Sequence, residues 1–364
     1  MLENITFPEH EYESVQNWLD KQGYCYTTRV YRETGKYKTG EFYLAPWGDV
    51  LQIDEVQTYR KVSDHPFHDE LSDAEKAEIR QYSEDMGLPY ELIRFSRRKI
   101  KMNSNEITDQ IKAYWNETSD SAWYRSLRTD ERIRRLKEKP ESAFHPAVYE
   151  LIRRYVTDIE GRRILLPSSG DNHAAFALAM MGARVTSADI SERQLENAAG
   201  IAEQLGLDIE FICDDTMQLS RISDQAYDMV YTSNGTLSWI SDIDSMNRNI
   251  CRVLKTGGYS VVYDMHPFNR PFSGEAGKTP RIVKSYHDVF PDLHWRLQDI
   301  INSQIKAGMS ICELAELPAT DASFWFTYDE LQKKKPEELE GINDWKKNPM
   351  AALPAWVTLI SKKA

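Results

Sequence analysis

From residue 161 onward, short apolar runs alternate with longer segments of helical periodicity. Strand-like runs stand at 162–169, 183–190, 207–215, 226–234, 259–268 and 353–364. Helical patterns lie between them at 172–183, 191–207, 242–258 and 295–308. Successive parallel strands need crossover connections, and these are right-handed. The pattern therefore predicts an α/β domain whose mostly parallel sheet carries helices on both faces.

The first hundred residues follow a different pattern, which predicts a small α+β unit. Helical spacing over 8–24 places three apolar side chains on one face: Val15, Trp18 and Leu19. Two β-prone runs follow, at 24–32 and 41–60.

A second helical segment of this unit, 71–87, begins at Ser72 or Asp73 and ends at Gly87. The run 90–100 then predicts an edge strand.

A polar stretch at 101–110 separates the two patterns and predicts a linker, and helical periodicity covers most of 110–156. We therefore expect three segments: a domain over 1–101, a linker and helical lid over 102–160, and the α/β domain over 161–364.

Composition narrows the class of protein. The 364 residues carry 45 Lys plus Arg against 57 Asp plus Glu, a net charge of −12, so bulk charge opposes binding to nucleic acid or anionic membranes. No apolar run approaches the roughly 18 residues of a membrane helix. The acidic N-terminal segment does not resemble a signal peptide. We therefore expect a cytoplasmic protein, and its oligomeric state stays open.

The four cysteines, Cys25, Cys213, Cys251 and Cys312, are far apart in the sequence and form no Cys-x-x-Cys pair. This spacing argues against a disulfide framework and a structural zinc site. We expect buried, reduced thiols.

Ligands of such sheets bind at the carboxyl ends of the strands, so the residues that follow each strand are candidates. The first strand leads into the small-residue turn Pro167–His173. This turn would let a ligand approach the backbone, and the N-terminus of the next helix would supply free N–H groups. An ordinary strand-to-helix turn is the alternative.

Acidic residues follow the next two strands. Asp189 stands 19 residues beyond Gly170, where a carboxylate can accept both ribose hydroxyls of an adenosine-type ligand. The third strand leads to Asp215, Thr216 and Met217, where the acid can accept from an adenine amino group and Met217 can flank the ring. The alternatives are a helix cap at Asp189 and a solvated turn at Asp215.

Taken in order, these segments resemble the class I S-adenosylmethionine-dependent methyltransferases over residues 105–364. The resemblance rests on ILLPSSGDN, VTSADIS, FICDDTMQL and AYDMVYTSNGTL, followed by RVLKTGG. It implies a Rossmann-like, mostly parallel seven-stranded sheet and S-adenosylmethionine as cofactor. The cofactor contacts that it implies are Ser168, Ser169, Gly170, Asp171, Asn172, Asp189, Ile190, Asp215, Thr216, Met217 and Ser233. Among these, the turn around Gly170 would meet the methionine part, Asp189 the ribose and Asp215 the adenine.

The first motif departs from the family pattern of an acidic residue followed by Gly-x-Gly-x-Gly. Leu166 stands at the acidic place, and the glycine places read Ser168, Gly170 and Asn172. Asp171, or a group on another loop, is expected to replace the missing carboxylate. A chain that has lost activity is the alternative.

The resemblance also indicates where a lid and reacting groups would lie. Helical segments before the first strand often cover the cofactor in this family, and the candidates here are Trp115, Trp123, Tyr124 and His145, with core packing as the alternative for each. Tyr124 and Asn234 are candidates for orienting the substrate. His266, with Asp264 on the same strand face, is the candidate general base. The alternative is that His266 and Pro267 only shape a loop.

The chain lacks two signatures of nucleic-acid methylation: an Asn-Pro-Pro-aromatic run after the fourth strand, and a loop cysteine that follows a proline. We therefore predict methyl transfer to an O or N atom of a small-molecule acceptor. The alternatives are an RNA (tRNA) methyltransferase and a non-catalytic module that binds the cofactor. A C-terminal insert over 314–350 would line a substrate pocket or cover the sheet through Phe324, Trp325, Phe326 and Trp345.

The first domain resembles the ASCH or PUA-like β-barrel domains more weakly, over 27–56. Such domains are thought to bind RNA, and the basic candidates are Arg29, Arg32, Lys36, Lys38, Arg94, Arg97, Arg98 and Lys99. Residues 1–101 nevertheless carry 14 Lys plus Arg against 19 Asp plus Glu, a net charge of −5. This balance opposes a general grip on RNA, and a small nucleotide or a protein ligand fits as well.

Overall fold

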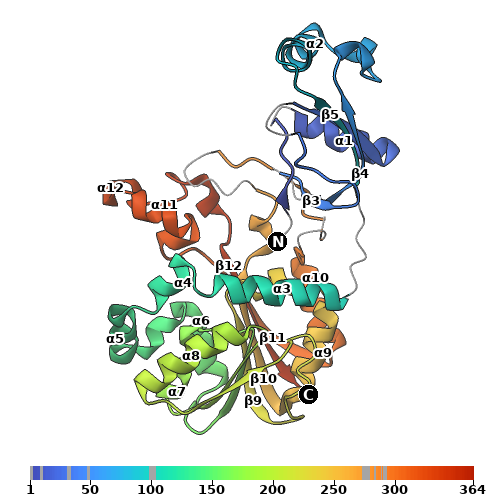
Figure 1. The fold of residues 1–364 in the computed structure, drawn as a ribbon. Coiled ribbons are helices and arrows are strands. Elements are labelled where there is room, and N and C mark those ends of the chain that lie inside the picture. The colour runs from blue at the N-terminus through green and yellow to red at the C-terminus, as the bar shows by residue number, and fades with distance from the viewer. Residues whose placement is uncertain are drawn as a thin grey trace. The chain divides into compact units, whose positions relative to one another are not determined.

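The chain is described here from a computed structural model over residues 3–8, 11–30, 34–46, 50–97, 104–272, 279–282, 284–287, 289 and 293–364. It divides into two units, Met1–Met102 and Asn103–Ala364. Each unit is described separately, with the elements labelled in Figure 1.

The second unit is built on a seven-stranded sheet in the order β11-β12-β10-β9-β6-β7-β8. Its strands are β6 (Arg163–Pro167), β7 (Arg184–Asp189), β8 (Ile209–Cys213), β9 (Tyr227–Ser233), β10 (Leu254–Met265), β11 (Met309–Leu317) and β12 (Trp356–Lys363). Adjacent strands pair in parallel except where β12 runs antiparallel to β10 and β11. The expected mostly parallel, seven-stranded sheet is confirmed, and its strand order reverses between β6 and β9.

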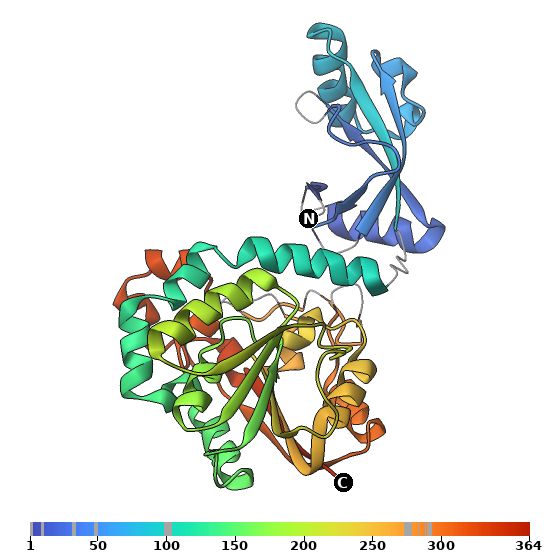
Figure 2. The ribbon, with the colours of Figure 1, turned by 60° about the horizontal axis from the view of Figure 1, so that its bottom comes forward.

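Helices cover both faces of this sheet (Figure 2). Side chains alternate between faces along β6: Ile164 and Leu166 pack in one apolar cluster and Leu165 in the other. The first cluster is closed by α6 (Pro146–Tyr155), α7 (His173–Met180) and α8 (Glu192–Leu205), and the second by α9 (Ile243–Val253) and α10 (Leu297–Lys306). Burial on both faces explains why the strands read as apolar runs in the sequence.

The remaining helices lie before and after the sheet in the chain. They are α3 (Ser104–Thr118), α4 (Ala122–Leu127), α5 (Asp130–Glu138), α11 (Tyr328–Lys333) and α12 (Pro336–Leu339), with short 3-10 turns at η6 (Pro140–Ala143), η7 (Thr236–Trp239), η8 (Pro267–Asn269), η9 (Ala322–Phe324) and η10 (Pro349–Ala352). None of the helices in the described part of the chain has the length and apolar character needed to cross a membrane.

Three boundaries differ from the sequence prediction. Strand β11 was not predicted, and the expected insert at 314 begins inside it; a register shift between Ile311 and Glu313 interrupts the alternation that would have revealed this strand. The helix expected to reach residue 258 ends at Val253, because β10 already begins at Leu254. Within the expected linker, residues 101–103 lie outside the described residues, and α3 begins directly after them.

The four cysteines are unpaired, in agreement with the sequence. Cys25 and Cys251 are buried and Cys213 is half-buried, whereas Cys312 is exposed, contrary to expectation. Cys312 lies on β11, one edge of the sheet, where one side-chain direction faces solvent.

The first unit contains a five-stranded sheet in the order β1-β3-β4-β5-β2. Its strands are β1 (Glu3–Asn4), β2 (Tyr24–Arg29), β3 (Phe42–Leu44), β4 (Val50–Tyr59) and β5 (Tyr90–Arg97), and its helices are α1 (Tyr12–Gln22) and α2 (Asp73–Arg80). Ser72 caps α2 through a capping box with Glu75, as one of the two predicted starts. Val15 and Leu19 of α1 pack into the core of this unit.

Three expectations for the first unit were wrong or are not supported. Trp18 is 53% exposed, because burial on α1 follows the four-residue step from Val15 to Leu19. Strand β5, expected at an edge, lies between β4 and β2. The outer strands β1 and β2 do not pair within the described residues, so the expected barrel is not closed there.

The apolar cluster beneath α6 gives a test of this packing. Ile152 is fully buried, so Ile152→Ala is expected to lower the free energy of unfolding by about 2–5 kcal/mol. Ile305, 53% exposed on α10, is the control, and Ile305→Ala should change it by less than about 0.5 kcal/mol. Urea titration followed by circular dichroism measures both, and equal losses would contradict the assignment of Ile152 to the core.

Candidate functional site

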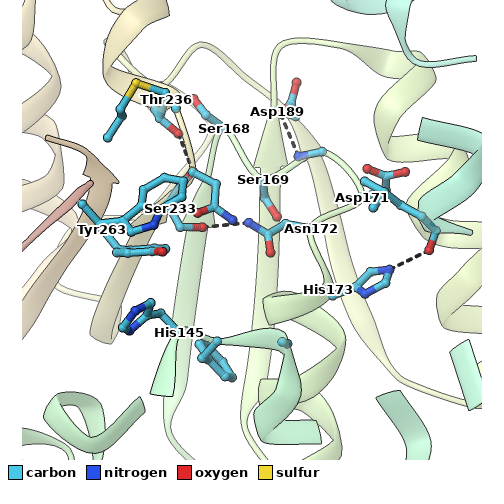
Figure 3. Close-up of a pocket in the computed structure, with 18 of the residues that line it drawn as sticks. His145, Ser168, Ser169, Asp171, Asn172, His173, Asp189, Ser233, Thr236 and Tyr263 are labelled. Atoms are coloured by element: carbon cyan, nitrogen blue, oxygen red, sulfur yellow. Dashed lines mark hydrogen bonds between the residues drawn. The ribbon is translucent and has the colours of Figure 1, made fainter. Parts of the chain in front are cut away.

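A cavity of about 1180 Å³ opens at the carboxyl ends of the central strands (Figure 3). Its lining includes every predicted cofactor-binding residue: Ser168, Ser169, Gly170, Asp171, Asn172, Asp189, Ile190, Asp215, Thr216, Met217 and Ser233. The lid candidates Trp115, Trp123, Tyr124 and His145 and the orienting candidate Asn234 also line it. His266 is not among the described residues that do so.

The turn after β6 keeps its tight shape although two family glycines are replaced. Ser168 adopts a left-handed conformation with φ of 49°, and Gly170 has φ of 50°. The Ser168 hydroxyl lies 2.7 Å from the Thr216 hydroxyl. A Cβ atom on Gly170 would lie 3.2 Å from Gln194 Oε1, so a larger residue there would have to displace the Gln194 side chain and hold a φ that favours glycine.

Asn172 connects this turn to the neighbouring strand. Its Oδ1 accepts the Ala174 amide at 2.9 Å and caps α7, while its Nδ2 donates to the Ser233 hydroxyl at 2.7 Å (Figure 3). The turn is therefore fixed against β9, the strand at which the sheet order reverses.

The next helix, α8, is capped by Ser191 and not by Asp189. Asp189 Oδ2 accepts the Gly170 amide at 2.8 Å and its Oδ1 the Ser191 amide at 2.8 Å. The side chain is buried, and burial raises its pKa from 3.8 to about 6, against the lowering effect of these amides. Two hydrogen bonds leave about half of the acceptor capacity of a carboxylate free.

The two acidic residues after β8 divide structural and ligand-facing roles. Asp214 accepts from the Asp215 and Arg221 amides and the Ser220 hydroxyl, so it holds the loop together. Asp215 lines the cavity and accepts the Met217 amide at 2.9 Å. Burial raises the pKa of Asp215.

An ion pair that sequence reasoning missed joins the lid to the first turn. Arg128 Nε donates to Asp171 Oδ2 at 2.5 Å, and Arg128 Nη2 donates to the Ser119 carbonyl at 2.6 Å. Asp171 is 5% exposed; burial raises its pKa and Arg128 opposes that effect. The partners are 43 residues apart, and no local motif pairs them.

Polar contacts also attach α3 to the start of α8. Asn116 Oδ1 accepts the Ser191 hydroxyl at 2.7 Å and the Arg193 amide at 3.2 Å. Lys112 pairs with Glu192. Because Ser191 also donates its amide to Asp189, the lid is connected to the carboxylate predicted to bind ribose.

Aromatic side chains of the lid pack against Trp239 of η7, and Trp115, Tyr124 and Trp239 line the cavity. The ring centroid of Trp239 lies 5.0 Å from those of Tyr114 and Trp115, and Trp115 lies 5.9 Å from Tyr124. Burial, followed by the charges of Asp171 and Asp189, raises the pKa of Tyr124. Its hydroxyl therefore stays protonated and suits orientation of a ligand rather than proton removal.

The prediction that Asp264 and His266 interact was wrong. Asp264 accepts the Gly235 amide at 3.1 Å and the Leu237 amide at 2.9 Å. His266 is fully buried, and its Nε2 pairs with Glu316 Oε1 at 2.8 Å. Strand β10 ends at Met265, so the alternation that would place the two side chains on one face no longer applies at His266.

His266 instead belongs to a local pattern that recurs along the chain. In each His-Pro dipeptide, Nδ1 of the histidine accepts a hydrogen bond from the amide two residues later. The Phe67 amide donates to His65 at 3.1 Å, the Ala147 amide to His145 at 3.3 Å, and the Phe268 amide to His266 at 3.1 Å. In the neutral ring the proton then sits on Nε2. These histidines shape turns, and the dipeptide is the sequence signal for it.

Several aromatic residues that line the cavity were not predicted from the sequence. Phe144, Tyr263 and Trp356 line it together with His145 and Phe324. Trp356 has its ring centroid 5.0 Å from both Tyr263 and Phe324.

Of the insert aromatics, only Phe324 is among the described lining residues. Trp325 is buried and donates to Asn343 at 2.6 Å, and Trp345 is 59% exposed. Phe326 packs in the same apolar cluster as Trp325. The insert therefore both lines the cavity and forms a core of its own.

The cavity retains polar groups that suit an adenosine-type ligand. Ser169 Oγ and Gln194 Oε1 are buried beside the first turn and have no hydrogen-bond partner in the described structure. Such groups usually find a partner, which a bound ligand can supply. No cluster of metal-ligating side chains occurs within the described residues.

Comparison with known proteins matches residues 167–258 to the family of methyltransferase domains. A ubiquinone biosynthesis O-methyltransferase of Coxiella burnetii is 31% identical over 122 residues, 34% of this chain and 51% of that protein. The protein of the same name from Bordetella avium is 29% identical over 121 residues, 33% of this chain and 50% of that protein. The chain spans about half the length of the curated relatives it matches.

Among solved structures, an S-adenosylmethionine dependent methyltransferase from Mesorhizobium loti has a TM-score of 0.44 at 21% identity, covering 60% of this chain and 98% of that chain. The family match covers the segment that contributes the first turn, Asp189, Asp215 and Ser233 to the cavity. Residues 167–258 are therefore similar to a methyltransferase domain.

Proposed function

We propose that the chain is a methyltransferase that moves a methyl group from S-adenosylmethionine to an O or N atom of a small molecule. The observation that carries the proposal is a single cavity that joins the Asp189 carboxylate and the Gly170 turn to an aromatic end at Tyr263 and Trp356. The names of the Coxiella and Bordetella relatives favour oxygen as the acceptor atom.

The residues at the turn end of the cavity fit the cofactor. Asp171 lines this end, carries a charge that complements the methionine ammonium group, and is proposed to replace the acidic residue whose place Leu166 occupies. Asp189 retains acceptor capacity for ribose hydroxyls, and Asp215 is placed to accept from an adenine amino group. When bound, S-adenosylmethionine supplies the reactive methyl group.

The protein contributes position and exclusion of water rather than covalent chemistry. Methyl transfer is an in-line displacement, so its rate depends on holding two reacting atoms in line. Trp115 and Tyr124 of the lid, together with Trp239 of η7, line this part of the cavity. Tyr124 and Asn234 are proposed to orient the acceptor.

We also propose that residues 1–101 are an ASCH or PUA-like module, supported by a mainly antiparallel five-stranded sheet packed against α1. The RNA alternative finds little support there. Arg29 is buried over Phe7, and the Arg94 guanidinium lies 4.4 Å from the Tyr24 ring centroid. Arg32, Arg98 and Lys99 lie outside the described residues.

Lys36 lies over the Tyr37 ring, and Lys38 pairs with Glu41 at 3.9 Å. The remaining basic candidate, Arg97, is the last residue of β5. We therefore propose a small-molecule acceptor rather than RNA, with the cytoplasm as location.

The function is tested by incubating the chain with methyl-labelled S-adenosylmethionine and a whole-cell extract. We expect label in material that passes a small-pore filter, and loss of this label with Asp189→Ala. Asp189→Ala should weaken S-adenosylhomocysteine binding about ten- to hundredfold in calorimetry, because charged hydrogen bonds contribute about 1.5–3 kcal/mol. Nuclease-sensitive label would favour the RNA alternative, and absence of cofactor binding by the unaltered chain would refute the proposal.

Cofactor affinity is expected to depend on the ionisation of Asp189. Its pKa of about 6 means that the carboxylate is ionised at pH 7 and largely protonated at pH 5, where it loses acceptor capacity. We expect S-adenosylhomocysteine to bind about tenfold more weakly at pH 5 than at pH 7. Because Asp171 and Asp215 also titrate, the diagnostic is the difference from Asp189→Asn, which should show a smaller pH dependence. Identical profiles would contradict the role of Asp189.

The turn-forming role of His266 gives a separate test. His266→Ala removes the cap on the Phe268 amide and should lower the free energy of unfolding by about 1–2 kcal/mol. Methyl transfer in the labelling assay should stay within about threefold at a temperature where the variant is folded. A general base would instead account for about 10²–10⁴ in rate, so a loss of that size would restore His266 as the base.

A further inference from the structure

One helix of the lid presents a row of cations to the cavity. Arg132, Arg135 and Lys139 all line it from α5 and its C-terminal cap. Their spacing of three and four residues places them along one side of the helix. Ile133 and Leu136, on another side, are buried in the core. The orientation of α5 is thus set by its apolar residues, and the cations face the cavity as a consequence.

Arg153 of α6 adds a fourth cation to the same wall. None of the four forms an ion pair with a carboxylate among the described residues, whereas their sequence neighbours do: Arg134 pairs with Glu138, and Arg154 with Glu313. The carboxylates that share the cavity wall here are Glu141, Glu150 and Asp321. Asp321 is engaged in capping η9 through the Ser323 amide at 2.8 Å.

A buried donor and aromatic side chains line the same cavity. His145 Nδ1 accepts the Ala147 amide, so Nε2 carries the proton of the neutral ring. This Nε2 is buried and makes no hydrogen bond of standard geometry in the described structure, although the Pro318 carbonyl lies close enough to act on the pKa of the ring. Burial lowers the pKa of His145, and the nearby Pro318 carbonyl only partly opposes this, so the ring is neutral at pH 7. The His145 ring lies 6.0 Å from that of Tyr263 (Figure 3).

Together these features describe a site for a ligand with a flat apolar body and an anionic group. Aromatic rings pack on planar ligands. The four cations are exposed to solvent, and Arg153 lies over the Tyr149 ring, but clustered cations that form no ion pair raise the local potential and attract an anion. We infer that the methyl acceptor is an aromatic compound bearing an acidic group, held with its ring against the exposed side of the Tyr263, Phe324 and Trp356 cluster and its oxyanion at the row on α5. This inference rests on the proposed function, because only a methyltransferase would bind its methyl acceptor at this site.

The test uses two probes that share one aromatic skeleton. 8-Anilinonaphthalene-1-sulfonate carries an anion, and N-phenyl-1-naphthylamine lacks it. Fluorescence titration of both is run on the full chain, with and without S-adenosylhomocysteine. The variant is Arg132→Gln/Arg135→Gln/Lys139→Gln. The matched control is Arg125→Gln/Arg134→Gln/Lys137→Gln, which removes the same charge from residues that are also exposed but are not among the lining.

We expect the unaltered chain to bind the sulfonate at least tenfold more tightly than the neutral probe. The cavity variant should lose about tenfold or more in sulfonate affinity, with neutral-probe affinity unchanged, and the control should stay within about twofold. Equal binding of the two probes, or equal effects of variant and control, would overturn the inference. Circular dichroism and thermal unfolding confirm that each variant is folded.

The two proposals can fail separately. Charge-dependent binding of the sulfonate without any binding of S-adenosylhomocysteine would keep the anion site and remove the methyltransferase assignment. Cofactor binding without charge-dependent sulfonate binding would keep the methyltransferase and remove the acidic acceptor.

Discussion

The Asp189 carboxylate is the contact on which the rest of the site depends. It accepts one amide hydrogen from Gly170 and one from Ser191, so it joins the turn after β6 to the start of α8. The carboxylate is buried, and an unsatisfied charge there would be costly, so the two loops are held where their amides reach it. The lid is attached to the same point, because the Ser191 hydroxyl donates to Asn116.

Charged side chains of both signs line the cavity. Carboxylates of Asp171, Asp189 and Asp215 gather at the turn end, and burial raises the pKa of each. Cations on α5 and α6, none of them in an ion pair within the described residues, line the same cavity. The chain has a net charge of −12, so this basic wall is a local feature of the fold rather than a reflection of composition. A cavity charged in this way discriminates between ligands by charge as well as by shape.

In the three His-Pro dipeptides, a backbone amide decides which ring nitrogen of the histidine can donate. A ring nitrogen that accepts an amide two residues ahead has no lone pair left for a substrate proton. His65, His145 and His266 share this arrangement because proline follows each of them and starts a turn whose next amide needs an acceptor. His145 lines the cavity, whereas both ring nitrogens of His266 are engaged, Nδ1 by the Phe268 amide and Nε2 by Glu316.

Much of the fold and of the turn-end site follows from the sequence, because their signals are local. Alternating apolar runs and helical periodicity predict the sheet and its layers, and the spacing from Gly170 to Asp189 marks two consecutive strand ends that any parallel sheet brings together. Strand β11 was not predicted, because a register shift breaks the alternation of its side chains. Only the tertiary structure decided the partners that cross elements: Arg128 meets Asp171 43 residues away, and His266 meets Glu316 50 residues away. Such contacts depend on where α4 and β11 pack, and that is set by burial of their other faces rather than by the residues that pair.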